Sequence, residues 1–128
     1  MTFNKGPFAG SYLNAEGVPE LSCEELGAFL KSEAADKVVL IDVRRPEEVS
    51  GELGHIEGSS RLTLETDFAR DMKSLDPQAT YVFVCRSGAR SSRAAGFALA
   101  HGFSSCFNLS GGMMAWNQLH YPVSKKPI

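Results

Sequence analysis

The segment TYVFVCRSGARSSRAAGFALAHG, residues 80–102, carries the clearest structural signal in this 128-residue chain. Its first residues, Thr80–Val84, are aromatic or β-branched and predict a buried strand. From Ala89 onward, small apolar residues recur at helical spacing, and Gly102 stands where a helix would end. The segment therefore predicts a strand, a short loop that begins at Cys85, and a helix.

The rest of the chain repeats this alternation of strand and helix. Further strands are expected in KVVLIDV (37–43), SSRLTL (59–64) and SSCFNL (104–109), and further helices at about 22–32, 45–53, 65–75 and 111–119. Such alternation is typical of an α/β domain with a parallel sheet covered on both faces. Residues 1–20 contain glycine and proline without periodicity, so we expect an irregular lead-in followed by one domain over residues 21–128.

Composition narrows the class of protein. Apolar residues make up 43% and charged residues 22% of the chain, which is ordinary for a globular domain. A net charge of −2 argues against a nucleic-acid partner, because phosphate recognition needs an excess of Lys and Arg. No apolar run is long enough to span a membrane, and the N-terminal residues lack the apolar core of a signal peptide. We therefore expect one cytoplasmic domain without a membrane partner.

The loop after the third strand is suited to holding an anion. Residues 87–89 are small, and Gly88 can adopt positive φ, so the backbone can curl around the sulfur of Cys85. The N–H groups of such a loop and of the helix that follows converge on one point. Arg86 and Arg90 add positive charge. We expect a thiol that ionises below the usual value of about 8.5 and a site that holds a negative group on the sulfur.

The three cysteines, at positions 23, 85 and 106, fit neither a disulfide framework nor a CxxC metal site. A buried core position is the alternative for Cys85, since free cysteine is among the most buried residue types. The arginines, the glycine and the helix start beside it favour an electropositive, partly exposed reactive site. We expect Cys106 in the core and Cys23 as a partly exposed bystander.

Four motifs, LIDVRRPEE, GHIEGS, CRSGARS and LSGGMMAW with YPV, occur in an order that resembles rhodanese domains over about Leu21 to Val123. The resemblance implies a central five-stranded parallel sheet flanked by helices on both faces. It also implies a sulfurtransferase in which Cys85 accepts sulfane sulfur, becomes a persulfide, and passes the sulfur to cyanide, a thiol or a protein. No metal and no organic cofactor is expected.

The same resemblance assigns roles within the site. Cys85 is the nucleophile, and Asp42 and Ser91 support the loop. Arg86 and Arg90 orient an anionic donor such as thiosulfate. The residues expected to bind the substrate are Arg86, Ser87, Gly88, Ala89 and Arg90.

Charged residues near the expected site have several candidate partners. We expect Arg44 to pair with Glu47 or Glu48. Arg93, one helical turn beyond the loop, is a candidate partner for Asp42 and could equally be solvated.

Other residues are interpreted as structural. His55 in the GHI motif suggests a general base, but a packing and turn role is favoured. Met113, Met114 and Trp116 are interpreted as core residues at helical spacing. His120 stands where rhodanese domains usually have glycine, so this chain departs from the family at the end of the last helix.

Two other functions remain open. One is a sulfur carrier or interaction module that receives sulfur from a protein partner. The other, disfavoured, is a phosphatase, because the related cell-cycle phosphatases have an HC-x5-R loop, whereas this chain has Val84 before the cysteine and only four residues between Cys85 and Arg90. Mercaptopyruvate-specific relatives have fewer charges in the loop, so the arginines favour an anionic donor.

Overall fold

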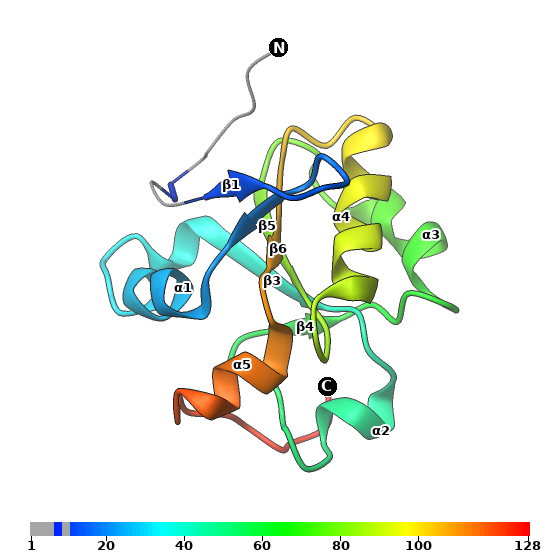
Figure 1. Cartoon of the computed structure of the whole chain (residues 1–128). Helices are drawn as coiled ribbons and strands as arrows, with labels where there is room; N and C mark the ends of the chain where they lie inside the picture. The colour runs from blue at the N-terminus through cyan, green and yellow to red at the C-terminus, as the bar shows by residue number, and fades with distance from the viewer. Residues whose placement is uncertain (1–6, 9–10) are drawn as a thin grey trace.

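The computed structural model describes residues 7–8 and 11–128 and contains one sheet with the strand order β1-β2-β6-β5-β3-β4 (Figure 1). The strands are β1 (Tyr12–Leu13), β2 (Pro19–Leu21), β3 (Val38–Asp42), β4 (Ser60–Arg61), β5 (Thr80–Val84) and β6 (Ser105–Leu109). The α-helices are α1 (Cys23–Leu30), α2 (Pro46–Val49), α3 (Phe68–Asp71), α4 (Ala89–Ala100) and α5 (Gly112–Gln118), with short 3₁₀ turns at Ala35–Lys37 and Met72–Ser74.

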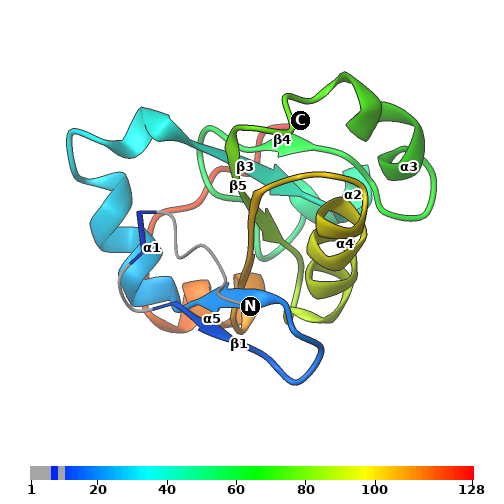
Figure 2. The same cartoon turned by 90° about the horizontal axis from the view of Figure 1, so that it is seen from above.

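Helices cover both faces of the sheet, as the sequence predicts. In β5, Val82 and Val84 face the core formed with α1 and α5, whereas Tyr81 and Phe83 face the core formed with α3 and α4. Figure 2 shows α1 and α5 on one side of the central strands and α4 on the other. This alternation explains why β5 is apolar throughout: every side chain from Tyr81 to Val84 is buried.

The sheet differs from the expected one in strand number and direction. It has six strands instead of five, and β1 pairs antiparallel with β2, so the sheet is mixed. β1 lies within residues 1–20 and β2 begins there, so the expectation of an entirely irregular lead-in is wrong; residues 1–6 and 9–10 of that segment lie outside the described residues. β2 is held by parallel pairing with β6, a contact between distant parts of the chain that local periodicity does not reveal.

Two of the expected helices are shorter than the sequence suggests. The helix expected over 45–53 is reduced to α2, and the one expected over 65–75 is α3 followed by a 3₁₀ turn. The start of α1 is as predicted, with the Ser22 hydroxyl accepting a hydrogen bond from the Glu25 N–H. Within residues 7–8 and 11–128, no helix combines the length and the hydropathy needed to cross a bilayer.

Candidate active site

The loop that carries Cys85 lies at the carboxyl edge of the parallel strands. β5 ends at Val84, which pairs with Asp42 at the end of β3. Gly88 has a φ of 110°, in the left-handed region that favours glycine, and α4 begins at the next residue. The chain therefore turns around the sulfur within a few residues, at the edge where open α/β sheets bind their ligands.

The sulfur of Cys85 is buried and accepts hydrogen bonds from the residues that follow it. Cys85 is only 1% exposed, so the expectation of a partly exposed thiol is wrong. Its Sγ accepts hydrogen bonds from the Gly88 N–H and the Ser91 hydroxyl, each at 3.1 Å. Within the described part of the chain, the backbone N–H groups of residues 86, 87, 89, 90 and 91 donate to no protein acceptor. These donors belong to the loop and the first turn of α4 after Cys85, a type of segment whose N–H groups commonly bind anions.

The first turn of helix α5 is hydrogen-bonded to the loop that carries Cys85. The N–H groups of Met113 and Met114 donate to the carbonyls of Cys85 and Arg86 at 2.9 and 3.0 Å. Gly112 makes this approach possible, because a Cβ at this position would lie 2.5 Å from the carbonyl oxygen of Cys85. The carbonyls of Cys85 and Arg86 are thereby directed toward α5.

The two loop arginines have different surroundings. Arg90 forms a two-pronged ion pair with Glu48 of α2, with both N–O distances at 2.9 Å. Hydrogen bonding from Arg90 lowers the pKa of Glu48 to about 2. Arg86 is exposed and forms no ion pair with any described residue. Of the two cations expected to orient a donor, Arg90 is already paired with Glu48, whereas Arg86 is free of ion pairs with the described residues.

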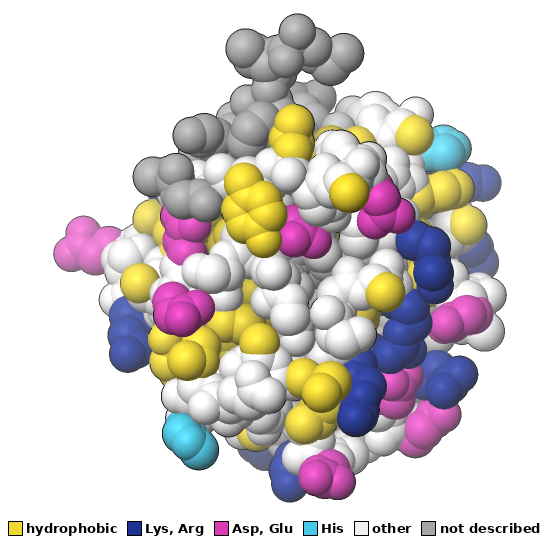
Figure 3. Space-filling model, viewed as in Figure 1, with side chains coloured by type: hydrophobic (Ala, Val, Ile, Leu, Met, Phe, Trp, Pro, Cys, Tyr) yellow, Lys and Arg dark blue, Asp and Glu magenta, His cyan; other side chains and the backbone are white. Residues whose placement is uncertain are grey.

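A cleft of about 220 Å³ opens beside Arg86. Figure 3 shows basic side chains gathered between α4 and α2, with acidic side chains next to them. Arg86 stands at one wall of the cleft, and the other walls carry mainly carboxylates. The lining residues are Arg44, Glu47, Glu48, Gly51, Glu52, Leu53 and Arg86.

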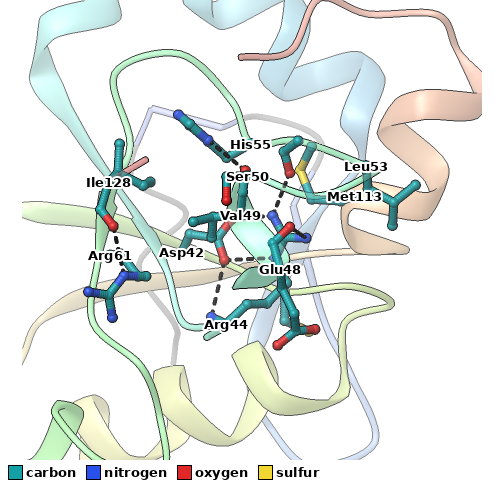
Figure 4. A network of polar contacts seen from close by, with 12 residues as sticks. Asp42, Arg44, Glu48, Val49, Ser50, Leu53, His55, Arg61, Met113 and Ile128 are labelled. Atoms are coloured by element: carbon teal, nitrogen blue, oxygen red, sulfur yellow. Dashed lines mark hydrogen bonds and ion pairs between the residues drawn. The ribbon is translucent and has the colours of Figure 1, made fainter. Parts of the chain in front are cut away.

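A buried ion pair supports the same edge of the sheet (Figure 4). Arg44 donates from Nε and Nη2 to the two carboxylate oxygens of Asp42, at 2.9 and 2.8 Å, and also to the Gly54 carbonyl. Both side chains of the pair are almost fully buried. The expected pairing of Arg44 with Glu47 or Glu48 is wrong, since it reaches only the backbone carbonyl of Glu48. The exposed Arg93 does not pair with Asp42.

His55 has the structural role that the sequence favoured. It is 3% exposed, its Nδ1 lies 2.9 Å from the Val49 carbonyl, and its backbone pairs with Ser124. Met113 and Trp116 are buried as expected, but Met114 is 39% exposed, so its assignment to the core is wrong. His120 follows α5 with a φ of 59°, so it adopts the left-handed conformation that glycine would favour.

The other two cysteines are buried away from the loop N–H groups. Burial raises the pKa of Cys106 to about 12, in keeping with the expected core position. Cys23 is only 2% exposed, so the expectation of partial exposure is wrong. Burial and the nearby charge of Glu24 raise the pKa of Cys23 to about 11. Over the described residues, no group of three or more potential metal ligands is close enough to hold an ion.

Sequence reasoning missed Asn108 as part of the site. This residue of β6 is 1% exposed, and its amide contacts both Gly88 and Ser91. The available signal was a single asparagine inside an otherwise buried strand, SCFNL. Glu48 was considered only as a partner for Arg44, and its bond to Arg90 depends on a contact across 42 residues.

A buried thiol that accepts hydrogen bonds from Gly88 and Ser91, just before a helix at the edge of a parallel sheet, is typical of proteins that hold an anionic group on cysteine. A model of the rhodanese-like domain family matches residues 23–119, and the chain belongs to this family.

Two relatives and one solved structure illustrate the similarity. YtwF of Bacillus subtilis, which its name presents as a candidate sulfurtransferase, is 41% identical over 86 residues, covering 67% of this chain and 80% of its own. A sulfurtransferase of Allochromatium vinosum is 31% identical over 106 residues, covering 83% of this chain and 94% of its own. The crystal structure of a rhodanese-related protein from Thermoplasma volcanium has a TM-score of 0.71 and 24% identity, covering 84% of this chain and 98% of that one.

Proposed function

We propose that this protein is a sulfurtransferase that moves sulfane sulfur from thiosulfate or a similar anionic donor, through a Cys85 persulfide, to a nucleophilic acceptor. The observation that carries the proposal is the group of unpaired N–H groups in the loop and first helical turn after Cys85, which suits an anionic sulfur atom attached to Cys85. The sulfurtransferase names of the relatives support the same reaction class.

The reaction has two displacement steps. In the first, the Cys85 thiolate attacks the outer sulfur of thiosulfate; the new S–S bond forms as the old one breaks, and sulfite leaves with the electron pair. In the second, cyanide or a thiolate attacks the terminal sulfur of the persulfide, and Sγ leaves with the electron pair, which regenerates the thiolate. Negative charge therefore lies on the terminal sulfur between the steps and on Sγ at either end. The loop N–H groups stabilise the charge on the terminal sulfur, and the Gly88 N–H and Ser91 hydroxyl stabilise the charge on Sγ.

The arginines have separate roles in this proposal. Arg86, exposed and without an ion pair among the described residues, meets the incoming dianion. Arg90 holds α4 to α2 through Glu48 and adds a positive charge to the field of the loop. The carboxylates of the neighbouring cleft repel anions, so they favour departure of sulfite once it has formed.

Steady-state transfer from thiosulfate to cyanide tests the proposal. We expect turnover by the wild type, loss to background in Cys85→Ser, and retention in Cys106→Ser, which removes an equally buried thiol outside the site. Hydrolysis of an aryl phosphate is measured on the same samples. Phosphate release that depends on Cys85 and exceeds sulfur transfer would replace this proposal with the phosphatase alternative. Sulfur transfer only from a protein donor would favour the carrier module.

A further inference from the structure

Asn108 contacts both groups that touch the sulfur of Cys85. Its Nδ2 donates to the Gly88 carbonyl at 3.0 Å, and its Oδ1 accepts from the Ser91 hydroxyl. Gly88 and Ser91 are the residues whose N–H and O–H lie 3.1 Å from Sγ. One side chain on β6 therefore supports both hydrogen-bond donors to the sulfur.

The orientation of the Asn108 amide is fixed by its partners. The two hydrogens on Nδ2 point to the Gly88 carbonyl and to Oε2 of Glu20, at 3.0 and 2.6 Å. The Gly88 carbonyl and the ionised carboxylate of Glu20 can only accept hydrogen bonds. If the amide were flipped, Oδ1 of Asn108 would face both of these oxygens, with no hydrogen between them. Oδ1 must then face Ser91 as an acceptor. Asn108 is 1% exposed, so water cannot replace these bonds freely.

Glu20 comes from the N-terminal hairpin. It lies in β2, where it pairs in register with Asn108 of β6. Its carboxylate also accepts from the Asn14 amide at 3.0 Å and from the Tyr12 hydroxyl at 3.2 Å. The hairpin thus holds a carboxylate against Asn108.

The Ser91 hydroxyl has one hydrogen and two acceptors within reach. When Cys85 carries a proton, the thiol can donate to Ser91 Oγ while Ser91 donates to Asn108. When Sγ is anionic, the same hydrogen can turn from Asn108 to the sulfur. Ser91 is fully buried, and its hydroxyl has no other acceptor among the described side chains. Asn108 therefore holds the Ser91 oxygen at a place from which its hydrogen can reach either Oδ1 or Sγ.

We propose that Asn108 is a positioning residue for sulfur transfer and that Glu20 sets its orientation. The inference rests on the proposed function, since it assumes that Cys85 carries the sulfur. Its effect should be largest when the persulfide is discharged, because Sγ then gains negative charge as the leaving atom and needs both donors. Loss of one charge-assisted hydrogen bond corresponds to about a tenfold or greater decrease in rate.

The test is a single-turnover measurement on protein preloaded with sulfur from thiosulfate and mixed rapidly with a small thiol. The discharge rate per loaded site is compared for the wild type, Asn108→Asp, Asn108→Ala, Ser91→Ala and Ser91→Ala with Asn108→Ala. Ser105→Ala is the matched control, since Ser105 is a buried polar residue at the other end of the same strand, bonded to Thr80. We expect Asn108→Asp to slow discharge about tenfold or more and Ser105→Ala to leave it within about twofold.

The double variant separates positioning from general damage to the fold. Asn108→Ala should slow discharge by a factor at least about threefold smaller in the Ser91→Ala background than alone, because one of its two routes to the sulfur is already absent. An equal factor in both backgrounds would contradict the proposal. Discharge by Asn108→Asp within about twofold of the wild type would also contradict it.

Glu20 provides a second pair of variants that does not alter the core of β6. Glu20→Gln keeps an oxygen that can accept from Asn108, so it should retain the wild-type discharge rate, whereas Glu20→Leu should slow it. Equal rates for these two variants would remove Glu20 from the proposal. If the wild type itself cannot be loaded with sulfur, the proposed function fails and this inference fails with it. If the wild type loads and the Asn108 variants match it, only this inference fails.

Discussion

Cys106 lies within β6 and Cys85 directly follows β5, the neighbouring parallel strand; the two residues are equally buried, each 1% exposed. Cys106 is opposite Tyr81 within the sheet, and its sulfur receives no hydrogen bond from any described residue, so burial alone raises its pKa to about 12. Cys85 lies just beyond the carboxyl end of β5, where Gly88 and Ser91 donate to its sulfur. The comparison teaches that position along the strand, and not exposure, gives the thiol its polar surroundings.

Cys23 extends this contrast, because the polar neighbours of its sulfur are acceptors and not donors. Its sulfur lies 3.7 Å from the carbonyl oxygens of Ser110 and Gly112. Carbonyl oxygens can only accept, so they offer no hydrogen bond to an anionic sulfur. Burial and the nearby charge of Glu24 raise the pKa of Cys23 to about 11. Among three buried cysteines, only the sulfur of Cys85 meets donors from the described residues.

The largest expected difference is in alkylation of the native protein by iodoacetamide. At pH 8, a thiol with a pKa of about 12 is ionised in roughly one molecule in ten thousand, so Cys106 should be nearly inert. We expect Cys85 to react at least about a thousandfold faster than Cys106, as measured by peptide mass spectrometry over time. Labelling in denaturant, where all three cysteines should react, is the control. Comparable rates for Cys85 and Cys106 in the folded protein would break the comparison.

The support from α5 to the loop can be removed with Gly112→Ala. A Cβ would lie 2.5 Å from the Cys85 carbonyl oxygen, so the loop must move, and we expect at least a tenfold loss of transfer and about 2 kcal/mol of stability. Gly102→Ala is the matched control, because Gly102 has a φ of 95° but nothing within 4 Å of the added Cβ. Transfer rates and urea unfolding are measured for both. Equal losses in the two variants would mean that backbone strain, and not the contact with Cys85, is responsible.

Substitution of Arg86 and of Arg90 should change the KM for thiosulfate to different extents. Arg86→Ala should raise the KM for thiosulfate about tenfold, since an exposed cation meets the dianion directly. Arg90→Ala should raise this KM less and lower the free energy of unfolding, because it leaves Glu48 without its partner. Steady-state kinetics with thiosulfate and with an uncharged sulfane donor separate these effects. A thiosulfate KM unchanged in Arg86→Ala would show that this side chain has another role.

The smallest expected effect concerns acid stability. Folded Glu48 has a pKa of about 2, below its ordinary value of about 4.5, so its ion pair stabilises the fold above about pH 4.5. This contribution is lost as the pH falls toward 2. Glu48→Gln should therefore be about 1 kcal/mol less stable than the wild type at pH 6, with a difference that shrinks toward pH 2. Denaturant unfolding across this range measures it, with Glu47→Gln, an exposed neighbour, as the control. A difference that does not change with pH would contradict the assignment.

Much of the fold could be predicted because each central strand and helix carries its own local pattern. KVVLIDV and TYVFVC predict β3 and β5, and the small residues of α4 indicate close packing on the sheet. The hairpin of β1 and β2 could not be predicted, because both strands are very short and β2 joins the sheet by pairing with β6, far away in the sequence.

The site was predictable where its residues are consecutive and less so where they come from separate elements. Cys85, Gly88 and Ser91 follow one another in a single loop and helix, so their convergence could be expected. The partners of Arg44 and Arg90 depend on the direction of each side chain after the backbone turns. Arg44 folds back to Asp42, two residues earlier, and Arg90 reaches α2, and neither contact follows from sequence spacing.

The central claim is that only Cys85 has surroundings fit to carry sulfur, and direct mapping of the sulfur tests it. The reduced protein is treated with thiosulfate, the persulfide is trapped with an alkylating reagent, and the peptides that contain Cys23, Cys85 and Cys106 are compared by mass spectrometry. We predict a mass increase of one sulfur atom on the Cys85 peptide alone. Sulfur found on Cys106 or Cys23, or on no cysteine at all, would contradict the account.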